Sequence, residues 1–332
     1  MAYASGDTIL DDHYNIFVQG GASADDHNTA NVNTVWGAGA TGDKGYGQSG
    51  DLSTVSAGTT ITATQWVNLL NRVSTLANHQ GSSITAITNP TTGNTISAYT
   101  ALSGNISTIF TNRGNAAANG TDITTNGTRT STTTWDVSAT ITRTVTFGSA
   151  AEARYFFNAG GMIRISNSLT GTSGDAKSLE WADLLSQCGT IVTTGGTATQ
   201  SIAGTSYTGT TKVGGSGTVN ILTTTTGYYD LTPGGAATTI FRQYADSAPY
   251  TANYVTITCA LSAASTVLTY VITLTDAAAD TVAPDGTGSG DALDVVDGTL
   301  SNIMVVRPPS TTYLTNTWGT PAMNAASWVM SS

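Results

Sequence analysis

The spacing of apolar residues is helical in the first part of this chain. The clearest pattern follows residue 60, where apolar positions recur every three or four residues and would form one stripe along a helix. Thr62 and Gln65 form a T-x-x-Q capping box in front of it, and Gly81 lies just beyond its end. The pattern predicts a helix around 63–79 whose apolar stripe comprises Trp66, Leu69, Leu70, Val73, Leu76 and Ala77.

Two shorter segments also have helical spacing. Residues 8–19 are followed by a pair of glycines, which end a helix, and a second segment runs over 96–111. The stretch from 20 to 60 is rich in glycine and turn residues. We therefore expect an ordered but irregular arm there, anchored by Trp36 and Tyr46.

The spacing changes to two residues after a polar, low-complexity stretch over 112–133, where we place a domain boundary. From Trp135 to Phe147 the odd positions are mostly apolar and the even positions are mostly threonine. This alternation predicts a long, half-buried strand. Threonine suits its outer face, because a β-branched side chain fits the pleat and keeps the surface wettable without charge.

Short strand-like segments with glycine-rich turns fill most of the remaining chain. Residues 153–158 and 162–166 are joined by a glycine pair, which predicts a hairpin. One helix is predicted to begin at a Ser178 cap and to end at Cys188. Further strands are predicted at 199–207, 217–224, 238–244, 253–261, 266–275 and 300–306.

Together these segments predict a mainly β protein. We expect an antiparallel β-sandwich in the C-terminal region with one inserted helix, preceded by a mixed helical and irregular N-terminal region. The expected units are an N-terminal region (1–130), a β-sandwich (131–306) and a C-terminal tail (307–332). The tail contains Trp318 and Trp328, which need a place to be buried. They would lie either on a neighbouring subunit or on the same β-domain, and the sequence favours neither.

Charged residues make up only 10% of the chain, against about 25% in an ordinary soluble domain. The net charge is −10, and the 11 lysines and arginines form no basic run. Nucleic-acid binding and attachment to anionic membranes both depend on clustered basic residues, so we expect neither. No stretch has the length of an apolar transmembrane helix, and the first residues lack the pattern of a secretory signal.

Candidate residues for chemistry are few. Asp-Asp-His occurs at 11–13 and at 25–27, and an aspartate-rich stretch runs over 276–297, but neither matches the ligand spacing of a metal motif. Cys188 and Cys259 are predicted to be buried free thiols; a disulfide would require their Cα atoms to lie within about 7 Å. The chain has only two glutamates and no catalytic signature. We therefore predict no enzymatic activity, no cofactor and no metal.

Two groups of motifs carry a resemblance to a known class of proteins. The first comprises GDKGYGQ at 42–48, VSAG at 55–58 and ITATQW at 61–66. The second comprises ARYFFNAGG at 153–161, IRIS at 163–166 and a helix with W-x-x-L-L at 181–185. These motifs resemble structural proteins of tailed phages, notably phages of cyanobacteria and marine bacteria. The resemblance implies a virion component, such as a tail fibre or a neck appendage.

The composition and the resemblance favour a structural subunit of a phage virion that is assembled in the host cytoplasm. We expect a homo-oligomer, a trimer or larger, which attaches to other virion proteins through its N-terminal region and could contact a glycan of the host surface. The candidate assembly contacts are aromatic, because aromatic residues dominate interface energetics: Trp36, Tyr46, Trp66, Trp318 and Trp328. A capsid-decorating or baseplate protein is the alternative within this class. A glycan-binding adhesin module and a glycan-cleaving enzyme are the alternatives outside it.

Overall fold

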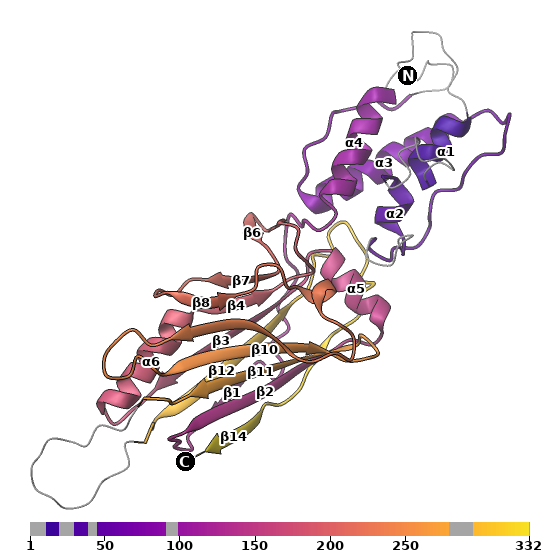
Figure 1. Cartoon of the computed structure of the whole chain (residues 1–332). Coiled ribbons are helices and arrows are strands. Elements are labelled where there is room, and N and C mark those ends of the chain that lie inside the picture. The colour runs from indigo at the N-terminus through magenta and orange to yellow at the C-terminus, as the bar shows by residue number, and fades with distance from the viewer. Residues whose placement is uncertain (1–10, 20–29, 39–44, 91–98, 279–294, 332) are drawn as a thin grey trace, which may run out of the picture.

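The computed structural model describes residues 11–19, 30–38, 45–90, 99–278 and 295–331. Helices α1 to α4 lie together at one end of the molecule, and the strand-rich region, with α5 and α6, occupies the rest (Figure 1). The last strand, β14, runs toward the end opposite the helices. The molecule is therefore elongated, with its helical and strand-rich parts arranged one after the other.

The helical region confirms the predicted capped helix. Thr62 accepts a hydrogen bond from the backbone of Gln65 (3.2 Å), and the Gln65 side chain accepts one from the backbone N–H of Thr62 (2.8 Å). Gly81 ends the helix in the left-handed conformation, with φ of 66°. The helices are α1 (Asp11–Gln19), α2 (Val32–Trp36), α3 (Ala63–Gln80) and α4 (Tyr99–Thr111).

Helix α2 is a correction to the expected irregular arm. It has five residues, too few to show a repeat of apolar positions, and it begins because the side chain of Asn31 accepts a hydrogen bond from the backbone of Thr34 (2.8 Å). Because the neighbouring segments are rich in glycine, the sequence predicts an irregular arm there rather than a helix.

Irregular segments of the helical region are held by what we call amide clamps. In each clamp, a side-chain carboxamide donates to the backbone carbonyl and accepts from the backbone N–H of one distant residue, at 2.8–3.0 Å. A single carboxamide thus imitates one residue of a neighbouring strand and satisfies both backbone groups. The clamps pair Asn15 with Val55, Asn33 with Leu52, and Asn105 with Thr85.

The strand-rich region contains two antiparallel sheets, which confirms the predicted fold class. The smaller sheet has the order β1-β12-β3-β4-β7, and the larger has the order β13-β2-β11-β10-β9-β8 with β14 also paired to β2. A separate hairpin is formed by β5 (Gln200–Ile202) and β6 (Thr205–Tyr207). The smaller sheet comprises β1 (Thr128–Ser131), β3 (Met162–Thr170), β4 (Thr190–Thr193), β7 (Thr210–Val213) and β12 (Thr299–Arg307). The larger comprises β2 (Ser138–Thr146), β8 (Val219–Leu222), β9 (Thr238–Tyr244), β10 (Tyr254–Leu261), β11 (Val267–Thr275), β13 (Ala322–Met323) and β14 (Ser327–Ser331).

The alternation predicted for β2 is present, and its inward face holds one charged residue. Arg143 is fully buried, and its guanidinium donates to the side chain of Asn302 and to the carbonyl of Asn126, both at 2.6 Å. Asn302 in turn donates to Asn167 (2.8 Å). This polar layer links the two sheets, because Arg143 lies on β2 of the larger sheet whereas Asn302 and Asn167 lie on the smaller sheet. Its hydrogen bonds would be lost if either sheet slipped by one residue.

The hairpin predicted at 153–166 is wrong, because residues 150–158 form helix α5 (Ala150–Asn158). Ser149 caps this helix by accepting from the backbone of Glu152 (3.1 Å), and Phe156 and Phe157 are buried in the core. Aromatic residues favour strands on average, but the cap and the packing of this short segment favour a helix. The described part of the strand-rich region therefore contains two inserted α-helices rather than one.

The second inserted helix, α6 (Ala176–Cys188), was predicted with the wrong cap. Asp175, rather than Ser178, is the capping residue, and it accepts from the backbone of Ser178 (2.7 Å). Cys188 at its end and Cys259 on β10 are buried free thiols, as predicted. Burial raises the pKa of each thiol to about 12, so both remain protonated at neutral pH.

Residues 307–332, predicted as a tail, return to the body of the protein. Strands β13 and β14 both pair with β2, so the structure places this segment on the same β-domain. A fourth amide clamp joins it to the helical region: Gln48 donates to the carbonyl of Thr315 (2.9 Å) and accepts from its N–H (2.8 Å). Asn158 of α5 also donates to the carbonyl of Gly45 (2.8 Å). These bonds fix the helices against one end of the sandwich.

Candidate functional site

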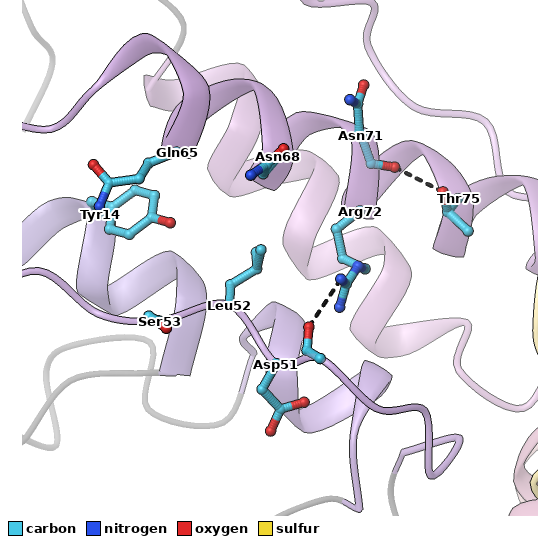
Figure 2. Close-up of a pocket in the computed structure, with 10 residues that line it drawn as sticks. Tyr14, Asp51, Leu52, Ser53, Gln65, Asn68, Asn71, Arg72 and Thr75 are labelled. Carbon is cyan, nitrogen blue, oxygen red and sulfur yellow. Dashed lines mark hydrogen bonds between the residues drawn. The ribbon is translucent and has the colours of Figure 1, made fainter.

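A polar groove of about 530 Å³ lies on the helical region between α1, α3 and the segment 50–53. Figure 2 shows side chains of α3 along one side of the groove and those of the segment along the other. Tyr14 of α1 lies at one end beside Gln65. The lining residues are Tyr14, Gly50, Asp51, Leu52, Ser53, Gln65, Asn68, Asn71, Arg72 and Thr75.

The groove exists because α3 buries one face and exposes another. The apolar stripe of α3 is buried, and the polar residues Asn68, Asn71 and Arg72 line the groove. The segment opposite is held in place by the clamps on Leu52 and Val55. The sequence predicted the buried stripe of α3 but gave no signal for the groove, because its second wall comes from an irregular segment.

Arg72 is the central charged residue of the groove. Its guanidinium lies 3.7 Å from the centre of the Trp36 ring, and its Nη2 donates to the carbonyl of Gly50 (3.0 Å). Burial lowers the pKa of Arg72, and the nearby Asp51 carboxylate partly offsets this shift. The Nη1 atom is buried and has no acceptor among the residues that the structure describes.

The chemistry of the groove suits a neutral polar ligand. One guanidinium and one carboxylate balance each other, and the remaining polar side chains are carboxamides and hydroxyls that both donate and accept hydrogen bonds. An extended peptide backbone presents the same alternation of donors and acceptors. The lining contains no histidine, cysteine or lysine that could act as a base or nucleophile at neutral pH.

A second candidate surface is the outer edge of the larger sheet at β14. The strand reads SWVMS, with no charged residue and no proline, and its Val329 side chain is 63% exposed. Val329 lies opposite Thr140 of β2, so it continues the outward face of that strand. The outward positions of β2 and β11 carry only serine, threonine and valine: Ser138, Thr140, Thr142, Thr144, Thr146, Val267, Thr269, Val271, Thr273 and Thr275. We call these residues, with Val329, the neutral face.

The five aromatic residues predicted as assembly contacts are not gathered on one surface. Tyr46, Trp66 and Trp318 are at most 1% exposed, so they pack within their own chain and offer no contact to a partner. Trp36 is half-buried with Arg72 over its ring. Trp328 is half-buried and packs against the core from β14. Three of the five candidates are therefore core residues, and Trp36 and Trp328 keep part of their surface exposed.

Three carboxylates meet at one point of the strand-rich region, which the sequence did not predict. Oxygen atoms of Glu180 and Asp183 on α6 and of Asp246 after β9 lie within 4.8 Å of one another. Such oxygens could ligate a divalent cation. The Gln187 amide already donates to Asp183 (2.6 Å) and to Asp246 (3.0 Å). Burial raises the pKa of Glu180, hydrogen bonds from Ser247 oppose the shift, and the two aspartates add to it.

The repeated Asp-Asp-His motifs do not form a described metal site. The ring of His13 packs edge-on against Tyr99, with ring centres 5.3 Å apart. The second motif, at 25–27, lies outside the described residues, as does 279–294 of the aspartate-rich stretch. His79 is buried, and its Nε2 lies 3.2 Å from the carbonyl of Ala159.

The chain matches no protein-family model, no curated protein and no solved structure. Among the described residues, no helix combines the length and the apolar character that crossing a bilayer requires.

Proposed function

We propose that this protein is a non-enzymatic structural subunit of a phage virion, and that copies of it associate along strand β14. The observation that carries the proposal is the uncharged outer edge at β14, with Val329 exposed beside the neutral face. An edge strand presents unpaired backbone N–H and C=O groups, to which another strand can pair.

The other sheet edges support this assignment by contrast. Strand β13 has only two residues, and β1 carries Arg129 in its middle. The edge strand β7 is joined to the residue after β8 by a hydrogen bond from Thr210 N–H to the carbonyl of Thr223 (3.3 Å). Charge, shortness and coverage are the usual protections of an edge. Strand β14 has none of these, so it is the edge suited to accept a strand of a second copy.

The second copy is the favoured occupant because β14 and its surroundings are self-complementary. The strand is uncharged, so two copies meet without like-charge repulsion. Antiparallel pairing of β14 with β14 would join two larger sheets and extend the neutral face across both. Many weak contacts of this kind add up in a repetitive particle.

Light scattering and a charged substitution test the association. The wild-type protein should be oligomeric at micromolar concentration, and Val329→Lys should shift it toward the monomer, because a lysine on the edge blocks pairing. Ile303→Lys is the matched control: Ile303 is a 37% exposed β-branched residue on β12 of the other sheet. A monomeric wild type, or equal masses for wild type and Val329→Lys, would refute association along β14.

The groove on α3 is the candidate site of attachment to another virion protein, in place of the buried Trp66. An incoming backbone carbonyl would supply an acceptor for the buried Nη1 of Arg72. Asn68→Trp should fill the groove and reduce incorporation into particles. Ser74→Trp, at an exposed position of α3 outside the groove, should not. Normal incorporation of Asn68→Trp would rule out attachment through the groove.

Immunogold labelling of intact particles tests the virion assignment. An antibody against this chain should label the particles of the phage that encodes it, at a repeated position. Absence of the chain from purified particles would overturn the virion assignment. The adhesin alternative is disfavoured at the groove, because the guanidinium of Arg72 covers the Trp36 ring on which a sugar would stack.

A further inference from the structure

A lysine and two aspartates form a buried cluster where α6 meets the larger sheet. The Lys177 Nζ lies 2.7 Å from Oδ1 of Asp136 and 2.7 Å from Oδ2 of Asp276. The side chains of Lys177 and Asp276 are each 2% exposed, and that of Asp136 is 16% exposed. Lysine and aspartate are rarely this deeply buried, so the cluster calls for an explanation.

Three separate elements bring these residues together. Asp136 precedes β2 and Asp276 follows β11; these strands are antiparallel neighbours, so the two aspartates lie side by side. The backbone N–H of Asp276 also donates to the carbonyl of Val137 (3.0 Å). Lys177 lies in the first turn of α6, whose start is set by the Asp175 cap. The cluster is thus fixed by strand register and by a helix cap.

Water has little access to Lys177 and Asp276, whose side chains are each 2% exposed. The rings of Trp135 and Trp181 pack edge-on with their centres 4.8 Å apart, and both are 1% exposed. Each is close in sequence to a member of the cluster. Separated charges in such a site have lost most of their hydration, which is costly even for a paired ion.

The contact between Lys177 and Asp276 has the proximity that bond formation needs. The Nζ atom of Lys177 lies 2.7 Å from Oδ2 of Asp276. The carbon bonded to Oδ2 therefore lies within about 4 Å of Nζ, near the roughly 3–3.5 Å separation of reacting atoms.

We propose that Lys177 and Asp276 form an intramolecular amide bond between Nζ and Cγ, with Asp136 as the catalytic residue that carries the proton. The product links α6 covalently to the end of β11. This modification goes beyond the proposed structural function and does not depend on it.

The reaction balances without any added reagent. The Lys177 ammonium first passes a proton to Asp276, which leaves a neutral amine and a neutral carboxylic acid. The nitrogen lone pair then attacks Cγ, forming the N–C bond. Asp136 accepts a second proton from Nζ and returns it to the hydroxyl oxygen, whose bond to Cγ breaks. That oxygen leaves as water, and the amide retains one hydrogen on nitrogen.

The electrostatics of the site support the first and last steps. Burial raises the pKa of Asp276, and the neighbouring Lys177 ammonium opposes this shift. Asp136 is the more exposed of the two carboxylates, and its Oδ1 lies 2.7 Å from the same amine, so it is placed to accept a proton from Nζ. The amide replaces a buried ion pair with a neutral group, and the exclusion of water disfavours hydrolysis of the product.

Mass spectrometry of the intact full-length chain tests the proposal. The folded wild-type protein should be lighter than its sequence mass by one water, and a digest should contain a branched peptide that joins residues 177 and 276. Asp276→Ala and Asp136→Asn should both have the full sequence mass for their variants. Asp183→Asn, which changes an exposed acid on the same helix, should still lose water.

The outcomes separate the bond from a simple ion pair. A full sequence mass for folded wild type would overturn the proposal, and so would a loss of water without the branched peptide. If Asp276→Ala does not fold, the peptide map of the wild type still decides. If folded Asp136→Asn forms the amide bond as fast as the wild type does, Asp136 has no catalytic role.

Discussion

Replacing His79 should change how the stability of the protein depends on pH. Burial lowers the pKa of His79 from 6.5 to about 4, while the bond to the Ala159 carbonyl opposes this shift. The ring packs edge-on against Tyr46, with ring centres 5.1 Å apart. The native state therefore holds the imidazole neutral over a range in which the unfolded chain binds a proton.

The sign and size follow from this difference. Above about pH 6.5 both states are neutral, and the stability is fully present. As the pH falls toward 4, only the unfolded state gains the proton, so stability is lost at up to about 1.4 kcal/mol per pH unit. Between pH 7 and pH 5 the loss attributable to this one group is about 2 kcal/mol.

Urea unfolding followed by tryptophan fluorescence, at one fixed protein concentration, measures this loss. His79→Gln keeps an amide donor for Ala159 but cannot titrate, so its stability should fall by about 2 kcal/mol less than that of the wild type between pH 7 and pH 5. Asp122 and Asp297, whose pKa values are lowered, contribute equally to both proteins and cancel. Identical pH slopes for the two proteins would refute the reasoning.

Three further substitutions test the helical region. Trp66→Ala should lower the free energy of unfolding in urea by about 3–5 kcal/mol, because the residue is fully buried. A loss below about 1 kcal/mol would contradict its place in the core. Gly47→Ala should cost roughly 1–3 kcal/mol, since φ is +66° and the new Cβ would lie 2.4 Å from the Tyr155 ring; an unchanged melting temperature would contradict that contact. Thr62→Ala should lower the free energy of unfolding by about 1 kcal/mol through loss of the cap to Gln65. Thr59→Ala, at an exposed position before the helix, is the neutral control. Equal stabilities of the two variants would contradict the capping role.

The parts of the fold that the sequence predicted are those governed by local periodicity. The stripe of α3 and the alternation of β2 and β11 each extend over several repeats, so their type and most of their bounds were predictable. Helix α2 has only five residues, and the aromatic residues of α5 favour a strand on average. The alternation places Arg143 on the inward face of β2. Its partner Asn302 comes from a distant strand, so local sequence could not predict the hydrogen bond.

The candidate surfaces depend on long-range contacts and were mostly not predictable. The groove needs the amide clamps on Leu52 and Val55, and the cluster of Lys177 needs the register of two strands. The same stripe that predicted α3 also implied that Trp66 faces inward. An assembly contact through Trp66 is therefore inconsistent with the pattern that predicts its helix. Exposure of Val329 depends on which strand is outermost, a property of the sheet order rather than of local sequence.

The amide clamps have a consequence for the conditions that the protein tolerates. Their donors and acceptors are carboxamides and backbone groups, none of which titrates near neutrality or attracts counterions. Dissolved salt screens the attraction between exposed charges, with a Debye length of about 10 Å at 0.1 M. The clamp between Gln48 and Thr315 contains no charge to screen. The joint between helices and sandwich should hold the same alignment in fresh water and in brine.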